Sequence, residues 1–131
     1  MPADPMPDTE LCSLAVDGPV ASLTLGRTEA YNALNNQLIS EIVDVMEWTS
    51  LRSVAATGGL RSEDGTERLR ALVIRSEGKH FCAGADINMM RDAGGKTPEE
   101  NRADSERLDR LFHGLWSHPC FTIACVQGVA L

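Results

Sequence analysis

The stretch GKHFCAGADINMM, Gly78–Met90, places four small residues, Cys82 to Ala85, between an apolar run and a segment of helical character. Alanine and glycine carry no acid–base group, so such a turn offers mainly its backbone N–H groups. The first turn of a helix leaves N–H groups unpaired, and the partial positive charge there favours an anion. This arrangement suits an oxyanion hole. A turn of small residues that only allows close packing is the simpler interpretation of this stretch alone.

Apolar runs on both sides of this stretch predict strands. Residues 71–76 (ALVIRS) and about 121–126 (FTIACV) are compact apolar runs typical of buried strands. Nearer the start, residues 11–16 and 20–25 predict two short strands joined by a tight turn at the sequence DGP. We therefore expect one sheet that begins with a hairpin.

Two long helices are predicted between these strands. Helical spacing of apolar residues covers 36–48, and Thr97, Pro98 and Glu100 form the signature of a second helix start. The stretch 49–70 is rich in glycine and charge, and we expect a surface loop there. The order hairpin, helix, strand, helix, strand predicts an α/β fold. The expected apolar face of the second helix contains Leu108, Leu111, Phe112 and Leu115.

The composition is that of one globular domain. The chain has 131 residues, of which 43% are apolar and 24% charged, and its formal net charge is −7. This charge argues against a nucleic-acid surface, and no apolar run is long enough to span a bilayer. Residues 1–10 are acidic and proline-rich, and we expect a disordered tail. They lack the features of a secretory signal, so we expect a cytoplasmic or mitochondrial-matrix protein.

The four cysteines predict no metal site. Cys12, Cys82, Cys120 and Cys125 form no C-x-x-C pair and have no regular spacing. We expect reduced, packed thiols. A catalytic role for Cys82 is the alternative, but no histidine or lysine is positioned by sequence to activate its thiol.

The motifs resemble one superfamily. FCAGADI, preceded by ALVIRSEG, resembles the signature of the crotonase (enoyl-CoA hydratase/isomerase) superfamily. Residues 25–42 are similar to that family's L-x-R-P-x-x-x-N-A-L pattern and first helix, and residues 119–131 to its P-x-P-T-I-A-A-x-x-G-x-A-L segment. Together, the motifs are most similar to those of the methylglutaconyl-CoA hydratase branch. The resemblance implies a crotonase-like ββα spiral, of which residues 11–131 are the N-terminal portion.

The resemblance also implies roles for individual residues. Ala85 matches the position whose backbone N–H forms half of the oxyanion hole for the thioester carbonyl. Ala83 and Ile87 match positions along the path of the CoA adenine and pantetheine, and Asp86 matches a polar position beside that pocket. Asn32 matches an asparagine that we expect to hold its loop by hydrogen bonds from its side chain to the backbone.

The sequence departs from the family pattern near the expected CoA phosphates. Thr28 stands where the family usually has proline, and Glu29 where a lysine or arginine often meets a phosphate. Arg27 or Lys79 could substitute for that cation. The substrate-binding residues expected from the resemblance are thus Ala83, Asp86, Ile87, Glu29, Tyr31 and Arg27.

The implied function is a lyase reaction on a coenzyme A thioester. A complete enzyme would add water to an α,β-unsaturated acyl-CoA through an oxyanion-stabilised enolate, without a metal or added cofactor. In the family, the second oxyanion N–H and the two catalytic glutamates follow the segment VQGVAL, so we expect residues 1–131 alone to be inactive. The alternatives are an enoyl-CoA isomerase or other crotonase reaction, and a non-catalytic scaffold subunit. Expected partners are acyl-CoA, the C-terminal half of the domain, and further copies in a homotrimer or hexamer.

Overall fold

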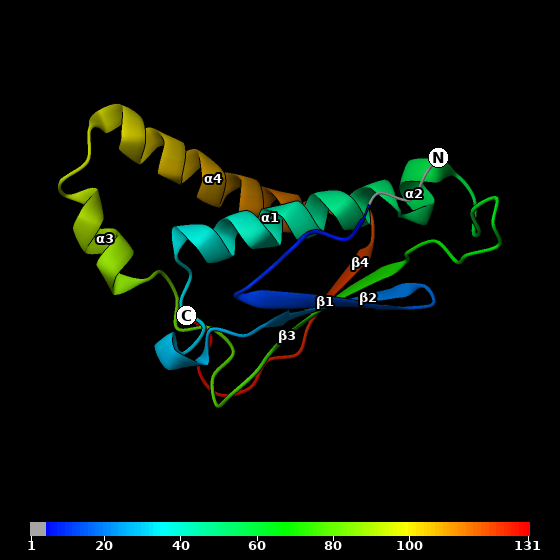
Figure 1. Cartoon of the computed structure of the whole chain (residues 1–131), viewed down its shortest axis with the longest axis horizontal. Helices are drawn as coiled ribbons and strands as arrows, with labels where there is room; N and C mark the ends of the chain where they lie inside the picture. The colour runs from blue at the N-terminus through cyan, green and yellow to red at the C-terminus, as the bar shows by residue number, and fades with distance from the viewer. Residues whose placement is uncertain (1–4) are drawn as a thin grey trace.

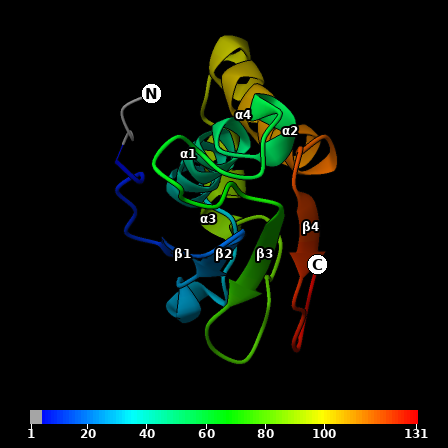
Figure 2. The same ribbon diagram turned by 90° about the vertical axis from the view of Figure 1, so that its right-hand side faces the viewer.

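In the computed structural model, which describes residues 5–131, strands form one mixed sheet with helices packed on one face (Figures 1 and 2). The sheet order is β1-β2-β3-β4. The β1–β2 pair is antiparallel and the other two pairs are parallel. This is the predicted α/β fold, with the hairpin at one edge. The strands are β1 (Cys12–Asp17), β2 (Val20–Leu25), β3 (Ala71–Ser76) and β4 (Phe121–Ala124).

Alternation of side chains along β2 sets the core. Ala21, Leu23 and Leu25 are buried, while the residues between them are only half-buried. The register pairs Leu23 with Leu14 of β1 and with Ile74 of β3, so apolar side chains from neighbouring strands meet on the face that the helices cover.

The helices begin where the sequence predicts. Asn35 caps α1 by accepting a hydrogen bond from the Leu38 N–H, and α4 begins with the full capping box of Thr97 and Glu100. The helix α1 lies between the sheet and α4 (Figure 1). The helices are η1 (Thr28–Ala30), α1 (Asn36–Leu51), α2 (Val54–Thr57), α3 (Ile87–Ala93) and α4 (Pro98–Trp116).

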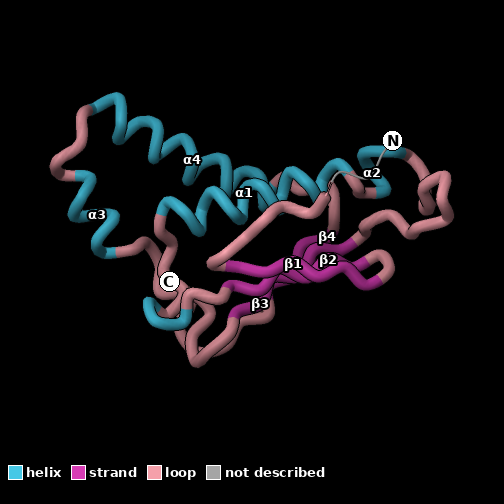
Figure 3. The backbone as a smooth tube through the Cα atoms, viewed as in Figure 1, coloured by secondary structure: helices cyan, strands magenta, loops and turns pink. Residues whose placement is uncertain are grey.

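The expected surface loop at 49–70 is partly helical. The helix α1 continues to Leu51, and α2 follows directly. Within this extension Thr49 is buried, and its hydroxyl donates to the Val45 carbonyl and lies 2.9 Å from His118 Nε2. His118 is therefore a packing residue, and burial lowers its pKa. Residues 58–68 do form a surface loop beyond α2 (Figure 3).

The packed face of α4 is narrower than predicted. Leu111 is buried, and Leu108 and Leu115 pack against the core. Phe112, expected on the same face, is mainly exposed, as is Trp116 one turn later. The stripe of α4 that packs against α1 is too narrow to bury every apolar residue near it.

The end of the expected tail is attached to the core. Residues 1–4 lie outside the described residues, but the N–H groups of Glu10 and Leu11 donate to the buried carboxylate of Glu41 at 2.8 and 2.9 Å. Glu41 also lies 3.7 Å from the Cys12 thiol. Burial, together with this carboxylate, raises the pKa of Cys12 to about 12. Cys12, Cys82 and Cys120 are buried free thiols, in agreement with the expectation.

The strand β4 lies at the open edge of the sheet and is poorly covered. Phe121 is 76% exposed and Ile123 is 44% exposed, and both belong to the same face of the strand. Within the described residues, no helix is long and apolar enough to cross a membrane.

We expect the polypeptide 1–131 on its own to associate or aggregate, because an apolar edge strand is a template for pairing with another chain. Sedimentation velocity tests this, with the double substitution Phe121→Lys and Ile123→Lys as the variant that should associate less. A compact wild-type monomer that unfolds cooperatively would contradict the expectation.

Candidate active site

Ala85 lies in the turn between β3 and α3, one residue before the helix cap Asp86. Leu34 holds the turn on both sides of Ala85. Its N–H donates to the Gly84 carbonyl at 2.7 Å, and its carbonyl accepts from the Asp86 N–H at 2.9 Å. In such a parallel bridge, the N–H of the middle residue points away from the partner strand. The Ala85 N–H therefore points away from Leu34.

The Ala85 N–H is free, whereas its neighbours are engaged. Among the described residues, none accepts a hydrogen bond from the Ala85 N–H, and Ala85 is exposed. The backbone N–H groups of Phe81, Cys82 and Ala83 all donate to carbonyls of other segments. A backbone donor that is fixed in place, unpaired and accessible to a ligand can stabilise an oxyanion once the ligand excludes water from it.

The C-terminal segment runs beside this turn. The Cys82 N–H donates to the Val129 carbonyl at 3.1 Å, and the Leu131 N–H donates to the Cys82 carbonyl at 2.9 Å. A Cβ added at Gly84 would lie 3.4 Å from Leu131 Cβ, so the two backbones are close neighbours.

Asn32 holds the loop after β2, as predicted. Its side-chain oxygen accepts from the Arg27 N–H, and its amide donates to the carbonyls of Glu77 and His80, each at 2.9 Å. The side chain is buried, with only 1% of its surface exposed. One asparagine thus links the loop after β2 to the loop after β3.

Arg27 and Asp86 form an ion pair beneath the turn. Arg27 Nη1 lies 2.7 Å from Asp86 Oδ2 and also donates to the Ala33 carbonyl at 2.9 Å. The other carboxylate oxygen of Asp86 accepts from the Met89 N–H and caps α3. The Met89 hydrogen bond, followed by the one from Arg27, lowers the pKa of Asp86. Asp86 is therefore an ionised structural cap and a poor proton acceptor.

Comparison with known proteins assigns the family. Residues 16–131 match the family described as Enoyl-CoA hydratase/isomerase.

The chain belongs to the enoyl-CoA hydratase/isomerase family.

Two named relatives and one solved structure illustrate the similarity. The chain is 29% identical over 92% of its length to the enoyl-CoA hydratase/isomerase YhaR of Bacillus subtilis, covering 41% of that protein. It is 26% identical to the 1,2-epoxyphenylacetyl-CoA isomerase of Escherichia coli, with 88% of this chain and 39% of the relative covered. The crystal structure of an enoyl-CoA hydratase from Shewanella pealeana has a TM-score of 0.75 at 34% identity, with 91% of this chain and 40% of that chain covered.

The chain spans about 40% of the length of these relatives. Enzymes of this family act on CoA thioesters and need no additional cofactor, in agreement with the sequence-based expectation. The neighbours also share the fold expected for a crotonase-like N-terminal part.

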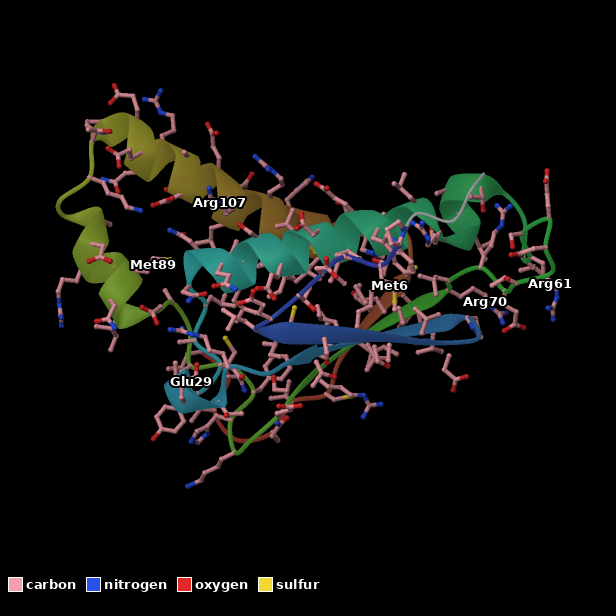
Figure 4. The ribbon with its side chains drawn as sticks, viewed as in Figure 1. Met6, Glu29, Arg61, Arg70, Met89 and Arg107 are labelled. Carbon is pink, nitrogen blue, oxygen red and sulfur yellow. The ribbon has the colours of Figure 1, made fainter. Side chains whose placement is uncertain are left out.

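The remaining residues expected at the family's substrate site lie at its surface. Ile87 on α3 and Tyr31 on the loop after β2 are 72% and 60% exposed, and Ala83 is half-buried. Figure 4 shows Glu29 on the loop after β2, and its side chain is mostly exposed at 4.0 Å from Arg27 Nε. Figure 4 also shows Met89 extending from α3 toward α1, where it packs on the core.

The two candidate phosphate-binding cations differ in surroundings. Arg27 has internal partners and a side chain that is 15% exposed. Lys79 is exposed on the loop after β3. Of these two, Lys79 is the side chain that can reach a ligand without breaking an internal ion pair.

Sequence reasoning missed His80 and Gly128 as a coupled pair. The Val129 N–H donates to His80 Nδ1 at 3.0 Å, and the His80 ring stacks edge-on against Tyr31 with centroids 5.4 Å apart. Gly128 has a φ of +59°, and an added Cβ would lie 2.3 Å from the Lys79 carbonyl oxygen. The glycine in VQGVAL can be identified in the sequence, but its contact with residues some fifty positions earlier cannot be predicted from the sequence.

We expect Gly128→Ala to destabilise the full-length protein by about 3 kcal/mol or more. A left-handed backbone costs an L-residue about 1–2 kcal/mol, and displacement of the backbone that blocks the new Cβ adds to this cost. The control is Gly65→Ala, where φ is +86° but nothing lies within 4 Å of the added Cβ. Denaturant unfolding should separate the two variants by about 2 kcal/mol, and equal losses would show that the close contact at Gly128 has no energetic weight.

Proposed function

We propose that the full-length protein is an enoyl-CoA hydratase that adds water across the double bond of an α,β-unsaturated acyl-CoA. The observation that carries this proposal is the free, exposed N–H of Ala85, held by Leu34 on both sides. Membership of the family supports the substrate class. The same N–H accounts for the small side chains around it, since the thioester oxygen has to approach the backbone closely.

In the proposed reaction, the Ala85 N–H donates to the thioester oxygen. The oxygen of water bonds to Cβ of the acyl chain, electrons move from the double bond onto the thioester oxygen as an enolate, and a proton then returns to Cα. The hydrogen bond strengthens as charge develops on the oxygen, so it lowers the barrier to the enolate. A second N–H would come from residues that follow Leu131, whose own N–H is bonded to the Cys82 carbonyl beside the site.

Proton transfer requires acids that residues 1–131 do not supply in the proposed mechanism. Asp86, the carboxylate next to Ala85, has both oxygens engaged by Arg27 and the Met89 N–H. We propose that two glutamates beyond Leu131 handle the water and the α-proton, as the family resemblance implies.

The proposed path of coenzyme A runs over the exposed surface near the turn. Ala83 and Ile87 would contact the pantetheine and adenine, Tyr31 would lie beside them, and Lys79 would meet a phosphate. The exposed carboxylate of Glu29 would weaken phosphate binding at its own position.

Two alternatives have specific support. The family description, which includes isomerases, favours an enoyl-CoA isomerase, and the 1,2-epoxyphenylacetyl-CoA isomerase of Escherichia coli among the relatives favours another crotonase reaction. Glu29, in place of a basic residue, favours a non-catalytic scaffold subunit that binds CoA weakly. Within the hydratase proposal, the resemblance of the motifs favours a methylglutaconyl-CoA-type substrate. The family resemblance also favours assembly with the remaining part of the domain in a homotrimer or hexamer.

An assay of the full-length protein separates these functions. Loss of absorbance of the enoyl thioester, with formation of the 3-hydroxyacyl-CoA, supports the hydratase, and a panel of straight and branched substrates, including methylglutaconyl-CoA, identifies the acyl group. A shifted double bond without uptake of water supports the isomerase. Absence of both turnover and measurable acyl-CoA binding would support the scaffold subunit.

A further inference from the structure

We propose that the Arg27–Asp86 ion pair positions the Ala85 N–H for the oxyanion, so that Arg27 acts on catalysis through the backbone without contacting the substrate. This inference rests on the proposed function, because it concerns the geometry of the donor proposed there. The sequence suggested a different role for Arg27, namely contact with a CoA phosphate.

Asp86, the residue that follows Ala85, is fixed by three contacts. Its N–H donates to the Leu34 carbonyl, one carboxylate oxygen accepts from the Met89 N–H, and the other pairs with Arg27. The peptide plane before Asp86 therefore cannot rotate freely. The preceding peptide, which carries the Ala85 N–H, is held through its Gly84 carbonyl by the Leu34 N–H, so both peptides that flank Ala85 are tied to Leu34. Movement of Asp86 would tilt the donor.

Arg27 connects the two segments that flank the donor. Its Nη1 donates to the Ala33 carbonyl, one residue before Leu34, and to the Asp86 carboxylate. Its own N–H is held by Asn32. The guanidinium thus clamps the segment that ends at Leu34 to the start of α3, and Ala85 lies between these two attachments.

Burial gives this pair a stronger effect than a surface pair. The side chains of Arg27 and Asp86 are 15% and 9% exposed, so water screens their attraction only weakly. A phosphate that recruited Arg27 would leave a largely buried carboxylate unpaired, which is costly. The internal role is therefore the favoured one for this arginine.

The test uses the full-length protein with three variants. Asp86→Asn retains a good helix N-cap but loses the charge, so α3 keeps its start while the ion pair is removed. Arg27→Met removes the guanidinium but retains a side chain of similar length, and the double variant combines both changes. The control is Arg61→Met, which removes an arginine from the exposed pair with Glu67, in the loop beyond α2.

Kinetics and ligand binding distinguish positioning from phosphate contact. We expect each single variant to lower kcat about tenfold or more while KM changes less than about threefold, because a misplaced donor loses transition-state stabilisation. The double variant should be about as slow as the slower single variant. By calorimetry, Arg27→Met should leave the affinity for free CoA unchanged and the affinity for a stable acyl-CoA thioester within about threefold of wild type, since the donor contacts only the thioester carbonyl and acts mainly in the transition state. Arg61→Met should behave as wild type.

Three outcomes would overturn the proposal. Equal weakening of CoA and acyl-CoA by Arg27→Met would identify a phosphate contact. Unchanged kcat in both single variants, or fully multiplicative losses in the double variant, would show that the pair does not act as a unit. Hydrogen exchange of the Asp86 N–H, which donates to the Leu34 carbonyl, provides a readout independent of activity, and should accelerate in both single variants. Absence of acyl-CoA binding and turnover in the wild type would refute the proposed function instead, and unchanged exchange would then refute the positioning role separately.

Discussion

Purified polypeptide 1–131 is expected to hydrate a short enoyl-CoA at least about 10⁴-fold more slowly than the full-length protein. Each general acid or base contributes about 10²–10⁴-fold, and both proposed glutamates lie beyond Leu131. Asp86 cannot replace them, because Arg27 and the Met89 N–H hold its carboxylate and lower its pKa. A spectrophotometric assay at high protein concentration measures the residual rate.

The full-length protein, assayed in parallel, is the positive control. A mixture of 1–131 with the separately produced remainder of the chain tests whether the slow hydration by 1–131 is due to the absence of the proposed glutamates. Recovery of turnover on mixing would support that explanation. Turnover by 1–131 alone near the rate of the full-length protein would place the acids within these residues and refute the proposed division of the site.

Ala85→Pro in the full-length protein is expected to lower kcat by about 10²–10³-fold, the usual cost of removing one oxyanion donor. Proline removes the N–H, and within residues 5–131 that N–H has no acceptor, so the substitution breaks no hydrogen bond of the described fold. The measurement is kcat and KM with the best enoyl-CoA substrate.

Ala85→Ser is the matched control, since it keeps the N–H and adds one small polar atom at an exposed position. Circular dichroism and retained affinity for free CoA check that Ala85→Pro remains folded. A folded proline variant with wild-type kcat would show that Ala85 does not stabilise the oxyanion. Equal losses in both variants would point to crowding by the side chain and against loss of the donor.

Local signals predicted most of the fold. The four strands and the starts of α1 and α4 follow from apolar patterning, the turn sequence between β1 and β2, and the capping signature at Thr97. The extension of α1 to Leu51 was not predicted. Thr49 is stabilised there by His118, sixty-nine residues later, and such a contact leaves no local trace in the sequence.

The candidate site was predicted in part. The FCAGAD motif located Ala85, and Asn32 was expected to hold its loop, which its hydrogen bonds to Glu77 and His80 confirm. The proposed oxyanion role of Ala85 stays a prediction. The contact of Gly128 with Lys79 could not be foreseen, because the pairing of the C-terminal segment with the turn exists only in the folded chain.

The sequence by itself determined the order of elements, the family and the turn that presents backbone donors, because periodicity, capping and glycine placement are local properties. Only the tertiary structure decided which N–H remains free and what Arg27 contacts. Leu34 forms hydrogen bonds with the backbone on both sides of Ala85. Arg27 forms an ion pair with Asp86, which lies fifty-nine residues later in the chain. Such pairings depend on how segments distant along the chain pack together, and local chain preferences do not specify them.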